Sequence, residues 1–316
     1  MKTTTMARVV FFILSSFLVA AAAPFSEESC HPDDHAALLA IKAALSNPGG
    51  LEYWTSDDSC CVWEEVECDP FTGRVINLSV TDDDTVAGTI PDAVAGLIHL
   101  ETLDLSRLKS LSGAIPPAVA KLSNLSTLVI SWTAVSGPVP PFLADLAALT
   151  ELDLSHNRLT GALPPPLFSK APQGEEIRLT LWHNNLTGGV PAEWSTVRFQ
   201  EIDLSENAFT GDASALFGKA KPLRVLDLYH NGFTFNLSGV ELPEGRLRYV
   251  DVSYNAIYGG IPAPVANLDQ LEVFDVSYNQ LCGEVPKNMA GFDADMFEHN
   301  KCLCGAPLPP CPHTAD

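Results

Sequence analysis

The chain has little positive charge. Its 316 residues include 18 Lys and Arg against 39 Asp and Glu, which gives a formal net charge of −21 at pH 7. A surface this acidic repels nucleic acids and anionic membranes, so we expect neither as a partner. It suits a basic protein partner, although an acidic surface can also serve solubility alone.

The chain also has no apolar run long enough to span a membrane. Its longest such run, residues 9–19, holds about 11 residues, whereas a membrane helix needs roughly 20. Lys2 and Arg8 precede this run and alanines follow it at 20–23, which is the pattern of a secretory signal peptide. We therefore predict a signal peptide at residues 1–23, secretion, and no membrane insertion.

Cysteine is absent from the middle of the chain. The eight cysteines form one cluster of four near each end: Cys30, Cys60, Cys61 and Cys68, then Cys282, Cys302, Cys304 and Cys311. In a secreted chain such clusters indicate disulfides, and each cluster allows three connectivities. Pairing in sequence order closes each end locally, which favours Cys30–Cys60, Cys61–Cys68, Cys282–Cys302 and Cys304–Cys311. A zinc site is the alternative, but no pair has the usual C-x-x-C spacing.

Catalytic patterns are missing as well. The histidines lack metal-ligand spacing, and no Ser-His-Asp arrangement or glycine-rich phosphate loop has a supporting context. The aspartates recur serially rather than as a pair facing each other across a cleft, which is what a glycosidase requires. We therefore expect no enzyme activity, no cofactor and no metal.

What the chain does contain is an internal repeat. The pattern L-x-L-x-x-N-x-L-x-G-x-[IVL]-P recurs with a period close to 24 residues, most clearly at 152–164. Its first apolar position falls at Ile76, Leu103, Leu128, Leu152, Leu179, Ile202, Leu226, Val250 and Phe274. This pattern predicts an α/β solenoid: a right-handed leucine-rich-repeat superhelix of about ten repeats, with a parallel sheet on its concave face.

Two cysteine-rich caps flank the repeats. Residues 24–74 form the predicted N-terminal cap, with a helix that begins at Pro32 and ends at the Asn-Pro-Gly-Gly segment 47–50. Residues 75–294 form the array, and 295–316 form a C-terminal cap with a degenerate last repeat. The caps are needed because the end repeats of a solenoid would otherwise expose their apolar faces.

Each repeat has two further features. An asparagine follows the strand pattern, where its side chain can bond backbone groups that a bend leaves unpaired, at Asn157, Asn184, Asn207, Asn231, Asn255 and Asn279. The Gly-x-Ile-Pro segment, as at 113–116, is typical of the plant class, which adds a second short strand. An insertion is expected at about 169–174, and the repeat at Leu226 lacks Gly-x-Ile-Pro. We expect both irregularities to lie off the concave face.

The mature chain resembles the plant polygalacturonase-inhibiting proteins. The most specific stretches are GDASALFG at 211–218, IYGGIP at 257–262, VSYNQLCG at 276–283 and KCLCGAPLPPC at 301–311. The resemblance implies a secreted protein of the plant cell wall with ten repeats, which binds fungal or insect endopolygalacturonases through its concave face and slows their digestion of pectin. Asn300 would then take the asparagine position of the tenth repeat.

The outward positions of the concave strands are the candidate binding residues. Between the two apolar residues of each strand lie Asp104, Val129, Asp153, Thr180, Asp203, Asp227, Asp251 and Asp275. Six of these eight are aspartates, whose mutual repulsion should raise their pKa values and whose charge would match a basic enzyme. The alternative is that Leu-Asp-Leu-Ser is common in plant repeats of every function.

Two residues beyond the second apolar position, large side chains recur. They are Arg107, Trp132, His156, His183, Glu206, His230, Tyr254 and Tyr278, with Trp182 and Tyr229 one residue earlier in their repeats. Protein interfaces are enriched in Trp, Tyr and Arg, which favours partner binding, whereas the alternative is that aromatic rings stack to shield the sheet. Arg224 and Val225, ahead of Leu226, complete the predicted set.

The histidines and the basic residues give two further hypotheses. His156, His183 and His230 lie near aspartates that favour their charged form, so binding to a basic partner should weaken between about pH 7 and pH 5. A basic cluster is either a weak pectin site or, more simply, a solvated face; it consists of Lys219, Lys221, Arg224, Arg246 and Arg248.

Four glycosylation sequons occur, at Asn77, Asn124, Asn185 and Asn236. We expect sugar on two or three of Asn124, Asn185 and Asn236, marking surfaces that a partner does not cover. Asn77 is the least favourable, because it takes an outward position within a strand.

The sequence leaves more than one function open. The first is inhibition of pathogen endopolygalacturonase in plant defence. The second is a soluble receptor-like ectodomain that binds a peptide or a receptor kinase in development. Ice binding is a remote third, because the threonines do not form a regular array.

Overall fold

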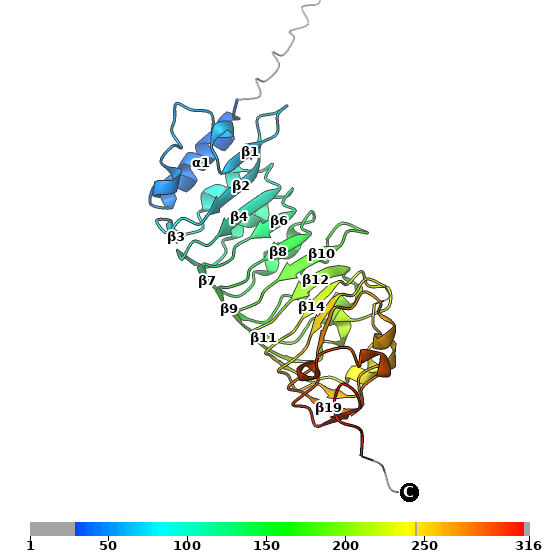
Figure 1. Cartoon of the computed structure of the whole chain (residues 1–316). Helices are drawn as coiled ribbons and strands as arrows, with labels where there is room; N and C mark the ends of the chain where they lie inside the picture. The colour runs from blue at the N-terminus through cyan, green and yellow to red at the C-terminus, as the bar shows by residue number, and fades with distance from the viewer. Residues whose placement is uncertain (1–28, 244, 313–316) are drawn as a thin grey trace, which may run out of the picture.

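The computed structural model describes residues 29–243 and 245–312, and it forms the predicted solenoid. The repeats stack into one elongated body whose N-terminal and C-terminal ends lie far apart (Figure 1). The predicted signal peptide at 1–23 lies outside the described residues. Across the described ranges, no helix is both long enough and apolar enough to cross a bilayer.

The concave sheet takes one strand from each of nine repeats and its first strand, β1, from the N-terminal cap. Within the described residues its order is β1-β2-β4-β6-β8-β10-β12-β14-β16-β18, and the neighbours are parallel except for the antiparallel pair β1 and β2. The strands are β1 Val66–Cys68, β2 Val75–Thr81, β4 Thr102–Ser106, β6 Thr127–Val129, β8 Glu151–Asp153, β10 Ile177–Thr180, β12 Phe199–Asp203, β14 Val225–Asp227, β16 Tyr249–Asp251 and β18 Val273–Asp275. Each strand turns its leucine positions into the core and the residues between them outward.

The second strand of each repeat builds further sheets, as the Gly-x-Ile-Pro segments predict. The larger has the order β15-β13-β11-β9-β7-β5-β3, and the smaller β17-β19-β20. The strands are β3 Ala87–Thr89, β5 Ser110–Gly113, β7 Ala134–Gly137, β9 Arg158–Gly161, β11 Asn185–Gly188, β13 Ala208–Gly211, β15 Gly232–Phe233, β17 Tyr258–Gly259, β19 Gln280–Glu284 and β20 Cys302–Cys304. Gly161 ends β9 with a φ of 80°, a left-handed conformation that favours glycine at this motif position.

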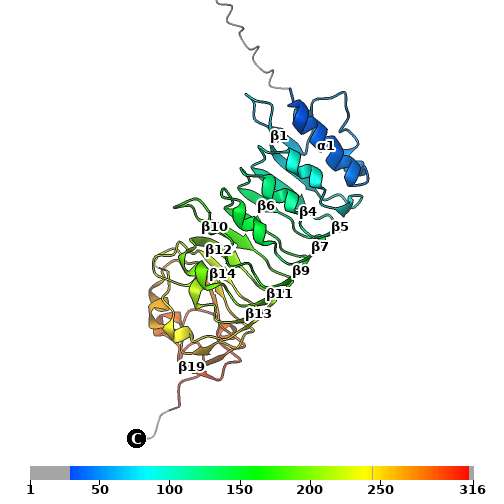
Figure 2. The ribbon, with the colours of Figure 1, turned by 180° about the vertical axis from the view of Figure 1, so that it is seen from behind.

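One α-helix and several short 3-10 helices complete the fold. Helix α1, Pro32–Ala44, covers the N-terminal end of the stack, and its bounds confirm the predicted helix (Figure 2). The His31 side chain accepts the N–H of Asp33 at its start. The 3-10 helices are η1 Gly49–Leu51, η2 Cys60–Val62, η3 Asp92–Gly96, η4 Pro117–Lys121, η5 Pro141–Asp145, η6 Ala192–Thr196, η7 Ser214–Leu216, η8 Leu237–Gly239, η9 Ala263–Asn267, η10 Lys287–Met289 and η11 Ala294–Met296.

The core is one continuous column of apolar side chains that runs from α1 to the C-terminal cap. The asparagines line its margin and hydrogen-bond to the backbone of two repeats, as predicted. The Asn231 Nδ2 donates to the carbonyls of Leu204, Leu228 and Tyr229, and its Oδ1 accepts the N–H of Phe209. Asn300 makes the same set of bonds at the tenth repeat. These bonds satisfy groups that the bend after each strand would leave unpaired.

The first repeat is one place where the sequence register is wrong. The structure pairs Leu78 with Leu103 and Val80 with Leu105, so Leu78 and not Ile76 is the first apolar position. Leu78 is fully buried, whereas Ile76 is half-buried. β2 is longer than the later strands because it also pairs with β1. Its alternation of apolar residues therefore begins at Ile76, two residues before the position that aligns with the other repeats.

The four predicted disulfides are all present: Cys30–Cys60, Cys61–Cys68, Cys282–Cys302 and Cys304–Cys311. A buried ion pair, which the sequence did not indicate, also holds the N-terminal cap. The fully buried Asp34 lies 2.7 Å from an Arg74 guanidinium nitrogen and accepts the N–H of Val75 at 2.8 Å. Helix α1 is thereby tied to the first strand of the repeat array.

Candidate binding surface

The concave sheet presents a central row of outward side chains. The strand register aligns them in the order Ser79, Asp104, Val129, Asp153, Thr180, Asp203, Asp227, Asp251 and Asp275. The row contains the eight positions predicted from the sequence, and each of its side chains is half-buried between its neighbours. The predicted row of aspartates on the concave face therefore exists, and its side chains are partly buried.

The aspartates have a structural role that explains why they recur. The Asp153 carboxylate accepts the N–H of Ser155 at 2.8 Å, where the chain leaves its strand. The same bond, from the residue two positions on, recurs at Asp203, Asp227, Asp251 and Asp275. Each carboxylate thus caps the end of its own strand. This bond is the physical basis of the alternative interpretation, in which the aspartate serves the repeat whatever it binds.

Burial, more than repulsion, raises the pKa values of four aspartates of this row. Burial raises the pKa of Asp104, Asp203 and Asp251, and neighbouring carboxylates add smaller increases. Burial and the nearby Asp203 together raise the pKa of Asp227 to about 7. Repulsion between the carboxylates, which the sequence predicts as the cause, acts in the same direction but is the smaller contribution. Asp227, in the middle of this row, is consequently neutral in mildly acidic solution.

A second outward row lies nearer the edge where the concave strands begin, which we call the strand-start edge. The register gives it as Asn77, Thr102, Thr127, Glu151, Arg178, Glu201, Val225, Tyr249 and Val273. Val225 was predicted on this face; Tyr249 was missed. The Tyr249 hydroxyl bonds to Asp227, and burial together with Asp227 and Asp251 raises the pKa of Tyr249. Its place directly before Val250 in the alternation could have identified it.

The sequence suggested that the large side chains beyond the second apolar position lie on the concave strands. In the structure they lie just after the strands. They share a left-handed backbone with φ between 50° and 58°, and we call the set the turn ladder: Arg107, Trp132, His156, His183, Glu206, His230, Tyr254, Tyr278 and His299. Each marks the bend at which the chain leaves the concave sheet. Hydrogen bonds to the next repeat support this strained conformation, such as that from the Arg107 N–H to the Ser131 carbonyl at 2.9 Å.

The rings of the turn ladder stack on one another in its N-terminal half. The Trp132 and His156 ring centroids lie 3.3 Å apart, those of His156 and His183 lie 4.1 Å apart, and the Trp182 ring meets His156 edge-on. His183 Nδ1 lies 2.8 Å from a Glu206 carboxylate oxygen. Trp132 nevertheless stays 45% exposed. The rings therefore shield one another, as the second interpretation expects, and part of their apolar surface remains exposed. Partner binding by this group stays a prediction.

The C-terminal half of the ladder stacks in the same way. Tyr254 and Tyr278 have centroids 4.0 Å apart, and Tyr278 and His299 have centroids 4.1 Å apart. Tyr229 meets Tyr254 edge-on at 5.5 Å, and His230 lies beside both. Tyr254 and Tyr278 are each 40% exposed.

One part of the histidine hypothesis is wrong. Burial and the neighbouring His183 lower the pKa of His156, although the sequence argument expected acidic neighbours to raise it. The stacked rings on either side exclude the water that would stabilise the imidazolium. The predicted weakening of binding between pH 7 and 5 stays a prediction, since protonation of the aspartates acts in the same direction.

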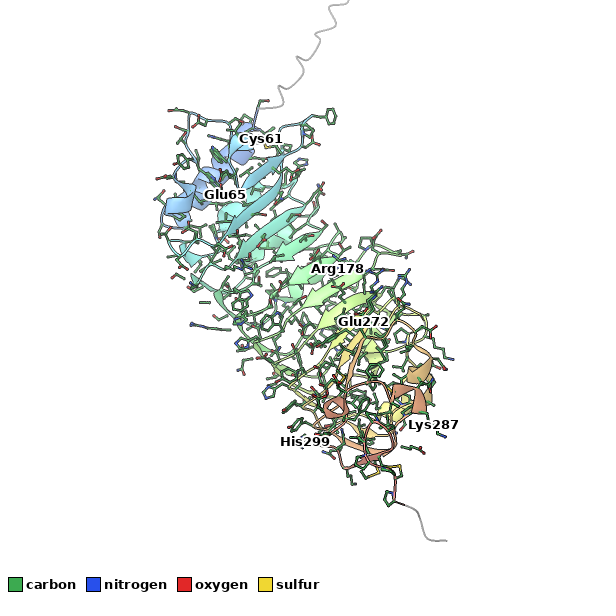
Figure 3. The ribbon with its side chains drawn as sticks, in the orientation of Figure 1. Cys61, Glu65, Arg178, Glu272, Lys287 and His299 are labelled. Atoms are coloured by element: carbon green, nitrogen blue, oxygen red, sulfur yellow. A yellow bond between two sulfur atoms is a disulfide. The ribbon has the colours of Figure 1, made fainter. Side chains whose placement is uncertain are left out.

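The predicted basic cluster changes its membership. Lys221 Nζ is directed away from solvent and donates to the carbonyls of Trp194 and Val197, and burial lowers its pKa to about 8. Arg178 and Arg198 join the cluster instead. Arg178 and Glu272 lie along the same margin of the structure (Figure 3).

This basic cluster is largely paired with acidic side chains. Glu176 lies 2.7 Å from an Arg246 nitrogen and 3.9 Å from an Arg198 nitrogen, and Glu272 lies 3.2 Å from an Arg248 nitrogen. Burial alone would raise the pKa of Glu176, but hydrogen bonds from Arg246 and Gln200 outweigh it and lower the pKa. The pairing supports the simpler interpretation of a solvated, salt-bridged face over a weak pectin site.

The sequons lie on different surfaces. Asn124, Asn185 and Asn236 are exposed, Asn185 at the start of β11 and Asn236 as the cap of η8, where it accepts the Ser238 N–H. Asn77 is half-buried in β2 and accepts a hydrogen bond from the Ser79 hydroxyl at 2.9 Å. Glycosylation stays a prediction, with Asn77 again the least accessible.

The fold and this surface define a leucine-rich-repeat protein of the plant type. Residues 31–69 match the family model "Leucine rich repeat N-terminal domain", and residues 148–170 match "Leucine Rich Repeat". Within the described residues, the one group with metal-ligand geometry is Cys30, Cys60 and Cys61, all of which are in disulfides.

Comparison with known proteins gives the family. The chain is 40% identical to the polygalacturonase inhibitor of Pyrus communis over 310 residues, which cover 91% of this chain and 94% of that protein. It is 39% identical to polygalacturonase inhibitor 2 of Arabidopsis thaliana over 326 residues, covering 96% and 98%. The chain belongs to the polygalacturonase inhibitor family, whose members are inhibitors and not enzymes.

Other matches are shorter or differ in name. The match to polygalacturonase inhibitor 1 of Oryza sativa subsp. japonica, at 40% identity, covers only 40% of that protein. Among solved structures, a plant ice-binding protein is similar with a TM-score of 0.76 and 39% identity, over 91% of this chain and all of that one. The solenoid is therefore shared with a protein of a different name, so the fold alone does not define the function.

Proposed function

We propose that the protein inhibits endopolygalacturonases by docking its concave sheet over the substrate cleft of the enzyme, so that pectin is excluded. The observation that carries the proposal is the near-complete match to two relatives named polygalacturonase inhibitor. We propose further that the enzymes come from fungi or insects, and that the protein acts in the plant cell wall in defence.

The chemistry of the concave face supports it as the docking surface. The aspartate row carries negative charge at neutral pH, which would attract and orient a basic enzyme. The exposed part of Trp132 and its neighbour Trp182 provide aromatic contact area beside that charge. An interface of standard size buries roughly 1,600 Å², which a sheet of this many strands can provide.

A panel of fungal endopolygalacturonases tests the proposal, with reducing-end release from polygalacturonate as the readout. We expect the wild type to inhibit at least one enzyme, and Trp132→Ala with Trp182→Ala to weaken that inhibition by about tenfold or more. Lys121→Ala, at the end of η4 and away from the concave face, is the control and should match the wild type.

Two results would contradict parts of this proposal. If a folded wild type inhibits no enzyme of the panel, inhibition is not its function, and the receptor-like ectodomain becomes the better interpretation. If inhibition is seen but the tryptophan variant matches Lys121→Ala, docking uses another surface. Ice binding gains no support from the central row of the concave face, since Thr180 is the one threonine in that row.

A further inference from the structure

The turn between β1 and β2 carries a fully presented aromatic side chain. Phe71 is 84% exposed, the most exposed of the large hydrophobic residues in the described chain. The turn extends beyond the strands beside β1, at the N-terminal end of the concave sheet, in both views (Figures 1 and 2). An exposed aromatic ring lacks the stabilisation that burial would give. Such a ring is therefore a candidate contact for a binding partner.

The turn is held rigidly by its own hydrogen bonds. The Asp69 carboxylate accepts the N–H groups of Phe71 and Thr72 and the Thr72 hydroxyl, at 3.1, 2.8 and 2.7 Å. The Asp69 N–H donates to the Arg74 carbonyl, and the Gly73 N–H donates to the Asp69 carbonyl. Gly73 takes the left-handed conformation that closes the turn, with φ 64°. The backbone that carries Phe71 is thus held in place before any partner binds.

The turn is also continuous with the concave face. β1 is the first strand of the concave sheet, and its exposed Glu67 lies opposite Asn77 in the second outward row. Phe71 therefore lies just beyond the strand-start edge of the same surface. A convex partner bound to the concave sheet could therefore contact this turn within one continuous interface.

The surroundings of Phe71 indicate the chemistry of that partner. Glu67 is exposed, and hydrogen bonds from Thr72, with a further contribution from His99, lower the pKa of Asp69. The Asp69 carboxylate therefore keeps its charge to a lower pH than an ordinary aspartate does. An aromatic ring bordered by two carboxylates fits an apolar depression bordered by Lys or Arg, and does not fit a second copy of this acidic chain.

We propose that Phe71 is a docking anchor, which inserts into an apolar depression with a basic rim on the polygalacturonase that the concave face engages. This inference rests on the proposed function and adds a contact outside the sheet. The rigid turn limits the entropy lost on binding, so that one side chain can contribute strongly to affinity.

Affinity for an inhibited enzyme, measured by surface plasmon resonance on the full chain, tests the anchor. We expect Phe71→Ala to weaken binding about tenfold or more, mainly through faster dissociation, without a change in melting temperature. Tyr53→Ala is the matched control, since Tyr53 is 74% exposed in the same cap but lies outside the turn. It should stay within about twofold of the wild type. Asp69→Ala keeps the ring but loosens the turn, and should show an intermediate loss.

The outcomes separate the two proposals. If the wild type binds an enzyme and Phe71→Ala matches Tyr53→Ala, the anchor is wrong while the proposed function stands. If Asp69→Ala weakens binding but Phe71→Ala does not, the turn acts through its charge and the anchor is again wrong. If the wild type binds no enzyme of the panel, the proposed function fails and the anchor fails with it.

Discussion

At Asp227, burial and a hydrogen bond act on one carboxylate in opposite directions. Burial dominates and raises the pKa to about 7, whereas the bond from the Tyr229 N–H lowers it. In the unfolded chain the pKa returns to about 3.9. The folded state therefore holds the proton more tightly, so the stability contributed by Asp227 is fully present below about pH 4 and is lost as the pH rises through 7.

We accordingly expect the free energy of unfolding to fall between pH 5 and pH 8, by roughly 1–3 kcal/mol from Asp227. Asp104, Asp203 and Asp251 contribute with the same sign. Asp227→Asn keeps an acceptor for the Tyr229 N–H but cannot ionise, so its stability should vary less over this range. Urea unfolding at several pH values measures both slopes, and equal slopes would show that Asp227 does not titrate there.

Within a repeat, the asparagine side chain connects two coils by hydrogen-bonding to backbone groups of both. We expect Asn231→Ala to lower the free energy of unfolding by about 1–3 kcal/mol, since the Phe209 N–H loses its acceptor and the carbonyls of Leu204, Leu228 and Tyr229 each lose one of two donors. Asn288→Ala is the control, because that exposed side chain makes a single bond to the Ala266 carbonyl. Urea denaturation compares them, and equal losses would show that the asparagine bonds carry no special stability.

Individual residues of the repeats show which structural features the sequence predicts and which it does not. Leu152, Leu154 and Asn157 were placed correctly because alternation and a bend impose a residue type at each position. The left-handed bend at His156 was not predicted. The nine repeats that share this bend have Arg, Trp, His, Glu or Tyr there, so no single residue type indicates the conformation. Ile76 was misplaced for the opposite reason, since the apolar alternation of β2 extends beyond the repeat.

Over the whole molecule, each coil contacts mainly its neighbours, so stability is transmitted from one repeat to the next. The sequence predicted the two caps and their disulfides from cysteine clustering. It did not reveal the Asp34–Arg74 pair, because its members lie 40 residues apart and neither belongs to a motif. The pair closes the end at which the first apolar repeat would otherwise meet water.

We expect Arg74→Met to leave the Asp34 charge buried without its partner, at a cost of about 3–5 kcal/mol. The damage should be greatest at the N-terminal end, because the array responds through neighbouring contacts. In amide hydrogen exchange, α1 and β2 should lose protection first, while β14 to β18 keep it. Arg248→Met, which breaks only an exposed pair with Glu272, should change little. A uniform loss along the array would instead mean that the solenoid unfolds as a single cooperative unit.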